Sequence, residues 1–144
     1  MTVLSYLAAP LVHPIGLAMI ALGTFLGIYI GAIPGLSATM AISLLVSFTY
    51  GWSTDTSLAI MVGIYCGVVY GGSRSAILLN IPGAPAAVAT ALDGYPLAKK
   101  GLAGKAIGVT TISSVIGGFI GVILLAILAP LISKIALKFA ARDY

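Results

Sequence analysis

The tripeptide Ile-Pro-Gly occurs twice in this chain, at residues 33–35 and 81–83, and each copy interrupts a long apolar run. Glycine and proline both weaken a helix interior, proline by roughly 3 kcal/mol, so each copy is expected to break a helix. A helix broken inside an apolar environment leaves backbone N–H and C=O groups without partners. Such groups can bind a polar solute or an ion, so the two motifs predict binding chemistry.

Each copy follows a ladder of glycines spaced four residues apart. The ladders are Gly23, Gly27 and Gly31 before the first copy, and Gly63, Gly67 and Gly71 before the second. Small residues at this spacing let membrane helices approach closely, and packing alone is an equally good explanation of the ladders. A repeat of broken helices, however, is how many secondary transporters form a site at the middle of the bilayer. The Pro-Gly interruptions therefore favour transport over packing alone.

The composition excludes a soluble globular protein. The chain has 144 residues, of which 60% are hydrophobic and only 7% are charged, against roughly 25% charged in an ordinary soluble domain. Between Met1 and Thr54 there is no Asp, Glu, Lys or Arg, and Arg74 is the only one between Thr56 and Leu92. Apolar blocks of this length, separated by short charged joints, indicate membrane-embedded segments.

The net charge of +4 does not indicate a nucleic-acid partner. The basic residues sit mostly at the ends of apolar segments, where they favour the cytoplasmic face, and we expect the joint 93–105 to lie there. Cys66 is the single cysteine and is expected to be a small buried residue. The residues up to Pro14 lack a signal-peptide pattern and are expected to lie along the membrane interface, with a structural role for His13.

The first broken-helix region is expected at 15–50. It begins with a span over 15–33, about 19 residues or roughly 28 Å of helix, which is enough to cross the hydrocarbon layer. The apolar segment over 36–50 is shorter, at about 15 residues. It is therefore either a helix completed by flanking residues or a re-entrant half-helix.

The second broken-helix region is expected at 56–92, with a helix over 56–70 and interruptions at 71–75 and 80–85. Further along, the sequence predicts a turn at 93–96, a basic joint to 105 and a long span over 106–132. The fold class that follows is an all-α integral membrane protein, a bundle of transmembrane helices with Pro-Gly-broken or re-entrant segments. We expect one membrane-embedded domain over 1–144 that forms one half of a repeat-built transporter.

Three stretches carry a resemblance to a known family. They are Gly31–Ser37, Gly71–Gly83 and Asp93–Ala98, which read GAIPGLS, GGSRSAILLNIPG and DGYPLA. In this order they closely resemble the large membrane subunit of the tripartite tricarboxylate transporters, from about Gly16 to the C-terminus. Members of that family are considerably longer, and the chain is similar to their N-terminal portion.

The resemblance implies a multi-pass protein of the bacterial cytoplasmic (inner) membrane that takes up tricarboxylates or related citrate-like carboxylates. Uptake would be symport driven by an ion gradient, with sodium or a proton as the coupling cation and no other cofactor. The implied partners are a small membrane subunit and a periplasmic solute-binding protein, together with the lipid bilayer. An elevator-like motion of the broken-helix region is implied as the mechanism.

The resemblance also places substrate-binding residues at the breaks. The candidates are Gly35, Leu36, Ser37, Ser73, Ser75, Asn80, Pro82 and Gly83. The first three precede a helix whose free N–H groups would face an anion. The serine hydroxyls and the Asn80 amide suit a carboxylate. Carbonyls left unpaired by Pro82 suit a sodium ion, near Ser73 and Asn80.

Two charged residues keep two interpretations each. Arg74 is either a carboxylate clamp or an arginine that reaches from the apolar region to the interface. Asp93 is either a proton or cation site or, favoured by its turn sequence, a residue that bonds its own turn backbone.

Enzyme activity is not expected, and neither is a catalytic residue. The chain has no Glu, one His, one Cys and three Asp, and every Asp lies at the edge of a segment, which does not suit acid–base or metal chemistry. The alternative to a transporter is a non-transporting structural or assembly fragment of a membrane complex, which scaffolds or forms a homodimer. Such a fragment gains nothing from paired Pro-Gly interruptions.

Overall fold

The structure is a computed structural model that describes residues 14–140, and within this range it is helical and contains no strand. The elements in chain order are α2 (Pro14–Ala32), α3 (Ala38–Thr49), α4 (Thr54–Leu79), the 3-10 helix η1 (Pro85–Ala87), α5 (Val88–Lys99) and α6 (Ala103–Ala140). Three helices are long and apolar enough to cross a membrane: α2, α4 and the stretch Ala103–Pro130 of α6. The prediction of an all-α membrane protein is confirmed. His13 and the lead-in before Pro14 lie outside the described residues.

The chain divides into two compact units, the first ending at Thr110 and the second beginning at Thr111. The second unit is the continuation of α6, and in the stretch counted as a membrane span none of its residues is buried. The first unit holds both Ile-Pro-Gly motifs and all the candidate binding residues. That the chain forms a single domain stays a prediction.

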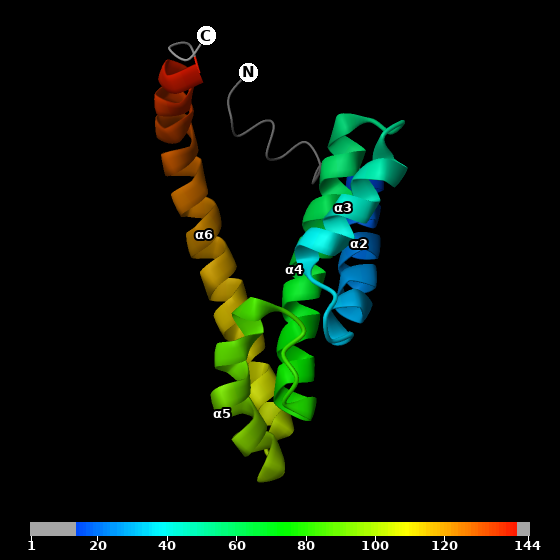
Figure 1. Ribbon diagram of the computed structural model, residues 1–144, viewed down its shortest axis with the longest axis vertical. Coiled ribbons are helices and arrows are strands. Elements are labelled where there is room, and N and C mark those ends of the chain that lie inside the picture. The colour runs from blue at the N-terminus through cyan, green and yellow to red at the C-terminus, as the bar shows by residue number, and fades with distance from the viewer. Residues whose placement is uncertain (1–13, 141–144) are drawn as a thin grey trace. The chain divides into compact units, whose positions relative to one another are not determined.

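The two glycine ladders hold α2 and α4 together. A Cβ built on Gly23 would lie 2.5 Å from the carbonyl oxygen of Ile60, and one built on Gly63 would lie 2.5 Å from that of Ile20. The contacts advance together along both helices, so α2 and α4 run parallel, side by side (Figure 1). Neither position can carry a side chain unless the backbones separate, which is why both ladders consist of glycine.

The short helix α3 returns across this pair and completes a small core. Ala41 of α3 is buried with Ile60, Ile64 and Val68 of α4. With 12 residues, α3 is about 18 Å long, too short to span the hydrocarbon layer by itself. Whether α3 is a helix completed by flanking residues or a re-entrant half-helix stays a prediction.

The interruption predicted at 71–75 is wrong, because α4 runs unbroken to Leu79. The hydroxyl of Ser73 donates to the carbonyl of Val69 at 3.2 Å, and that of Ser75 donates to the carbonyl of Gly72 at 3.0 Å. Hydroxyls bonded in this way are satisfied inside the helix. Gly71 packs against α2 rather than ending the helix. Tertiary packing therefore overrides the local weakness of the Gly-Gly-Ser sequence.

The turn predicted at 93–96 is also wrong, because these residues lie within α5. Gly94 lets α5 approach α4 closely, since a Cβ there would lie 2.6 Å from Cγ1 of Ile77. Pro96 is accommodated inside the helix, which ends with the Lys100 N–H bonded to the Pro96 and Leu97 carbonyls. The role predicted for Asp93, which was to bond the backbone of that turn, is therefore wrong as well.

Two smaller expectations also change. Cys66 is exposed on α4 rather than buried. The span predicted over 106–132 lies within α6, which continues to Ala140 with Pro130 inside the helix.

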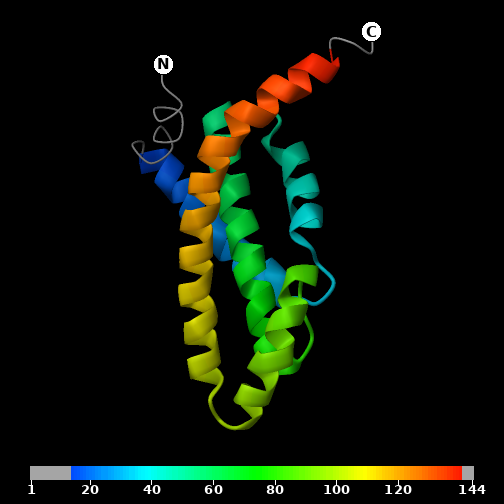
Figure 2. The same cartoon turned by 90° about the vertical axis from the view of Figure 1, so that its left-hand side faces the viewer.

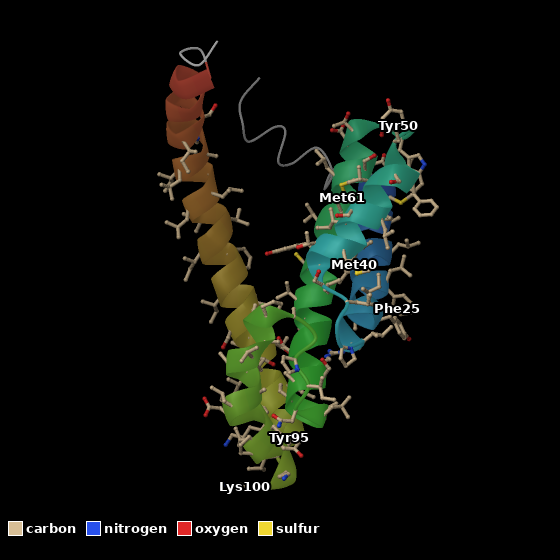
Figure 3. All side chains as sticks on the ribbon, in the orientation of Figure 1. Phe25, Met40, Tyr50, Met61, Tyr95 and Lys100 are labelled. Carbon is tan, nitrogen blue, oxygen red and sulfur yellow. The ribbon has the colours of Figure 1, made fainter. Side chains whose placement is uncertain are left out.

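The first unit has chemically distinct ends. Tyr50 lies at one end, and Tyr95 and Lys100 lie at the other (Figure 3). The chain passes from α4 to α5 through residues 80–84, and α5 then runs beside the last turns of α4 in the same direction (Figure 2). The first two turns of α6 follow after Gly101, whose φ of +78° requires glycine.

Candidate functional site

The two Ile-Pro-Gly loops meet in one pocket. Its volume is about 350 Å³, and it is lined by Gly35, Ser37, Pro82, Gly83, Ala84, Pro85 and Val88. The first two residues come from the loop between α2 and α3, and the next four from the loop and turn that lead to α5. Four of the eight candidate residues are thus brought together: Gly35, Ser37, Pro82 and Gly83.

The first loop is a turn that only glycine fits easily. Gly35 has φ +93°, and the N–H of Leu36 donates to the carbonyl of Ile33 at 3.3 Å. Ser37 then caps α3, and its hydroxyl accepts a hydrogen bond from the Met40 N–H at 3.3 Å. Nothing would contact a Cβ on Gly35 within 4 Å, so here glycine is needed for its conformation and not for space.

The second loop folds back onto the helices that precede it. A Cβ on Gly83 would lie 2.9 Å from Cα of Gly72 and 3.1 Å from the hydroxyl of Ser75, and it would also collide with the carbonyl of Gly31. The loop therefore rests on the C-terminal end of α2, where the first loop begins. This contact is what brings the two breaks to the same place.

Two helices begin beside this pocket. Helix α3 begins at Ala38, next to Ser37, and α5 begins at Val88 after η1. The first N–H groups of a helix have no partner within the helix, and they carry part of the positive end of its dipole. The residues that line the pocket include neither Asp nor Glu. Helix ends of this kind favour an anion even where no basic side chain is present.

The other candidates lie elsewhere. Ser73 is half-buried and Ser75 is 4% exposed, and both hydroxyls are bonded within α4. Asn80 is exposed and caps α4 in the left-handed conformation, with φ 59°, while its N–H donates to the Ala76 carbonyl. Leu36 lines a separate apolar cavity with residues of α2, α3 and α4. Of the residues proposed for sodium, only Pro82 lines the pocket, and that site stays a prediction.

Sequence reasoning missed three residues of the pocket: Ala84, Pro85 and Val88. Pro85 could have been found, because proline is favoured in the first turn of a helix and here marks the start of η1. Nothing in the local sequence marks Ala84 or Val88 as pocket residues. Within residues 14–140, no group of three or more His, Cys, Asp or Glu side chains gathers to hold a metal ion.

The sequence model of the Tripartite tricarboxylate transporter TctA family matches residues 17–144. The chain belongs to this family. An uncharacterised 52.8 kDa protein encoded in the TAR-I ttuC′ 3′ region of Agrobacterium vitis is 41% identical to it over 131 residues, which cover 91% of this chain and 26% of that protein. The chain thus spans about a quarter of the length of this curated relative. No solved structure matches the chain significantly.

The family assignment confirms the resemblance carried by the three sequence stretches. Two of them contain the loops that meet in the pocket, so stretches that carried the resemblance also line the candidate site. The third, DGYPLA, lies in α5, where Gly94 provides the close contact with α4.

Proposed function

We propose that this chain is part of the large membrane subunit of a secondary, ion-gradient-driven tripartite transporter that takes up tricarboxylates or related citrate-like carboxylates. The observation that carries the proposal is the meeting of both Ile-Pro-Gly loops in one pocket, where two helices begin. Membership of the TctA family supports the same function. A structural fragment would not need two breaks converging on one cavity.

The depth of the loops supports binding within the bilayer. Gly72, which contacts the second loop, lies about 26 Å along α4 from Asp55, at 1.5 Å per residue. Gly94 of α5 is level with Ile77, so Lys99 lies about 15 Å beyond Gly72. If these charged residues mark the two surfaces, a hydrocarbon layer about 30 Å thick encloses both loops, closer to the Lys99 side.

The electrostatics of the pocket argue for a coupling cation. A helix N-terminus stabilises an anion by roughly 0.3–1 kcal/mol, and by up to about 2 kcal/mol when partly buried. Removing one carboxylate from water costs several kcal/mol, and a tricarboxylate carries three. Two helix ends therefore do not suffice. A sodium ion or a proton bound with the substrate would offset part of this cost, and the backbone carbonyls beside Pro82 are suitable sodium ligands.

The family also supports the expected assembly. We propose that the complete subunit works by symport in the bacterial inner membrane as a multi-pass protein. Its partners would be a small membrane subunit and a periplasmic protein that delivers the carboxylate. The elevator-like movement of the broken-helix region belongs to the same proposal.

A charge placed in the pocket tests the proposal. In the full-length subunit with its partners, Ala84→Asp puts a carboxylate where the substrate would bind. Repulsion between like charges costs several kcal/mol, so uptake of labelled citrate should fall at least about tenfold. Ala84→Ser is the neutral control. Ala86→Asp adds the same charge at a neighbouring position that does not line the pocket.

Both control variants should transport normally, and all three proteins should reach the membrane in equal amounts. Normal uptake by Ala84→Asp would count against binding in this pocket. Equal losses in Ala84→Asp and Ala86→Asp would mean that the charge acts on the helix rather than on the substrate.

A further inference from the structure

A second cavity lies between α2 and α4, and it shares no lining residue with the pocket of the two loops. Its volume is about 560 Å³. The side chains that matter here are Phe25 and Tyr29 on α2, and Arg74, Leu78 and Leu79 on α4. It therefore combines one cationic group with aromatic and aliphatic walls.

Among the residues that the structure describes, Arg74 has no counter-anion. Its Nη2 donates to the Tyr70 hydroxyl at 2.5 Å, and its guanidinium carbon lies 4.1 Å from the centre of the Tyr70 ring. Its Nε is buried without a hydrogen-bond partner. The acidic residues within 14–140 are Asp55 and Asp93, and neither forms an ion pair with it. A cation in an apolar segment is expensive unless an anion compensates its charge.

The walls of the cavity suit hydrocarbon. Phe25 and Tyr29 are 60% and 62% exposed, and their rings pack edge to face with centres 5.0 Å apart. Leu78 and Leu79 are likewise exposed. Apolar and aromatic side chains exposed on membrane-spanning helices suit contact with lipid tails. A small tricarboxylate would find one cation and much apolar surface here, which is a poor match for three charges.

The depth of Arg74 suits a headgroup. It lies two residues beyond Gly72 on α4, about 12 Å before the level of Lys99. In the structure the guanidinium is held against Tyr70, which lies one turn nearer Asp55. Once it leaves Tyr70, the guanidinium can extend toward the phosphate level while its methylene groups stay in the apolar region.

We propose that this cavity binds an anionic phospholipid, with the headgroup phosphate on Arg74 and an acyl chain along Phe25 and Tyr29. The phosphate supplies the missing counter-anion, and arginine is well suited to phosphate because its planar guanidinium donates several hydrogen bonds. The inference depends on membrane insertion of the protein and not on what the protein transports.

The test is lipid retention by the full-length subunit, measured by native mass spectrometry after exchange into detergent with phosphatidylglycerol or phosphatidylcholine. The wild-type protein should retain phosphatidylglycerol in preference. Arg74→Gln should weaken this retention about fivefold, the value expected for one basic side chain near an anionic headgroup. Lys100→Gln removes the same charge outside the cavity and should leave retention unchanged.

A second variant keeps the proposal testable if Arg74→Gln does not fold. Tyr70→Phe removes the hydroxyl that holds the guanidinium and should weaken retention less than Arg74→Gln. Equal retention of the two lipids by the wild-type protein would overturn the proposal. So would displacement of the retained phosphatidylglycerol by inorganic phosphate or citrate, because that would identify a site for small anions.

Discussion

The two Ile-Pro-Gly loops share a tripeptide but use its glycine for different reasons. In the first loop, Gly35 adopts φ +93° and would have open space around a side chain. In the second, the positive φ falls on Asn80, and Gly83 is instead wedged against Gly31 and Gly72. The first loop is thus shaped by backbone conformation and the second by close packing. The same tripeptide at two sites therefore does not imply that its glycine has the same structural role at both.

The largest effect that follows from this difference is expected for Gly83→Ala. A methyl group there meets backbone on two sides, which cannot move as a flexible side chain would. The second loop must leave the end of α2, so the pocket should open. The free energy of unfolding of the full-length subunit in detergent should then fall by more than about 2 kcal/mol. Gly51→Ala, where nothing lies within 4 Å, is the matched control and should change little.

A smaller effect is expected for Gly35→Ala. The added methyl group meets no atom, so its cost is the strain of a positive φ, about 1–2 kcal/mol. The same stability measurement should rank this variant between Gly51→Ala and Gly83→Ala. If Gly35→Ala were as harmful as Gly83→Ala, the two loops would not differ in the way described.

The smallest effect, which sharpens the comparison most, concerns Asn80. Asn80→Gly keeps the left-handed cap and should leave stability within about 0.5 kcal/mol, whereas Asn80→Ala should lose about 1 kcal/mol or more. Citrate uptake by the glycine variant then reports on the amide alone. Lost uptake in a stable Asn80→Gly protein would assign the amide to the substrate, as the sequence predicted. Retained uptake would leave Asn80 with a role only in the backbone turn.

Local signals in the sequence predicted the outlines of the fold well. The first helix was expected to end at Ile33 and ends at Ala32, because proline and glycine act on the residues next to them. The same local reasoning failed at 71–75 and 93–96, where contacts with other elements hold the chain helical. In both places a glycine serves the packing of one helix on another.

The meeting of the two loops could not be predicted, because spacing along the chain does not fix distance in space. It follows from the parallel register of α2 and α4 and from the return of residues 81–84 onto Gly72. The two glycine ladders in the sequence indicated the first of these causes, the close packing of α2 against α4. The second depends on Asn80 reversing the chain, and a lone asparagine at the end of a helix is a weak signal.

The central claim is that both loops bind one carboxylate, and protection of cysteines from a water-soluble maleimide tests it most directly. In full-length protein from which every native cysteine, Cys66 included, has been removed, single cysteines are introduced by Ser37→Cys and by Ala84→Cys, with Lys100→Cys as the control outside the pocket. With the coupling cation present, citrate should slow labelling at both Ser37→Cys and Ala84→Cys and leave Lys100→Cys unchanged. Labelling that citrate slows at neither position, in protein that still takes up citrate, would contradict the account.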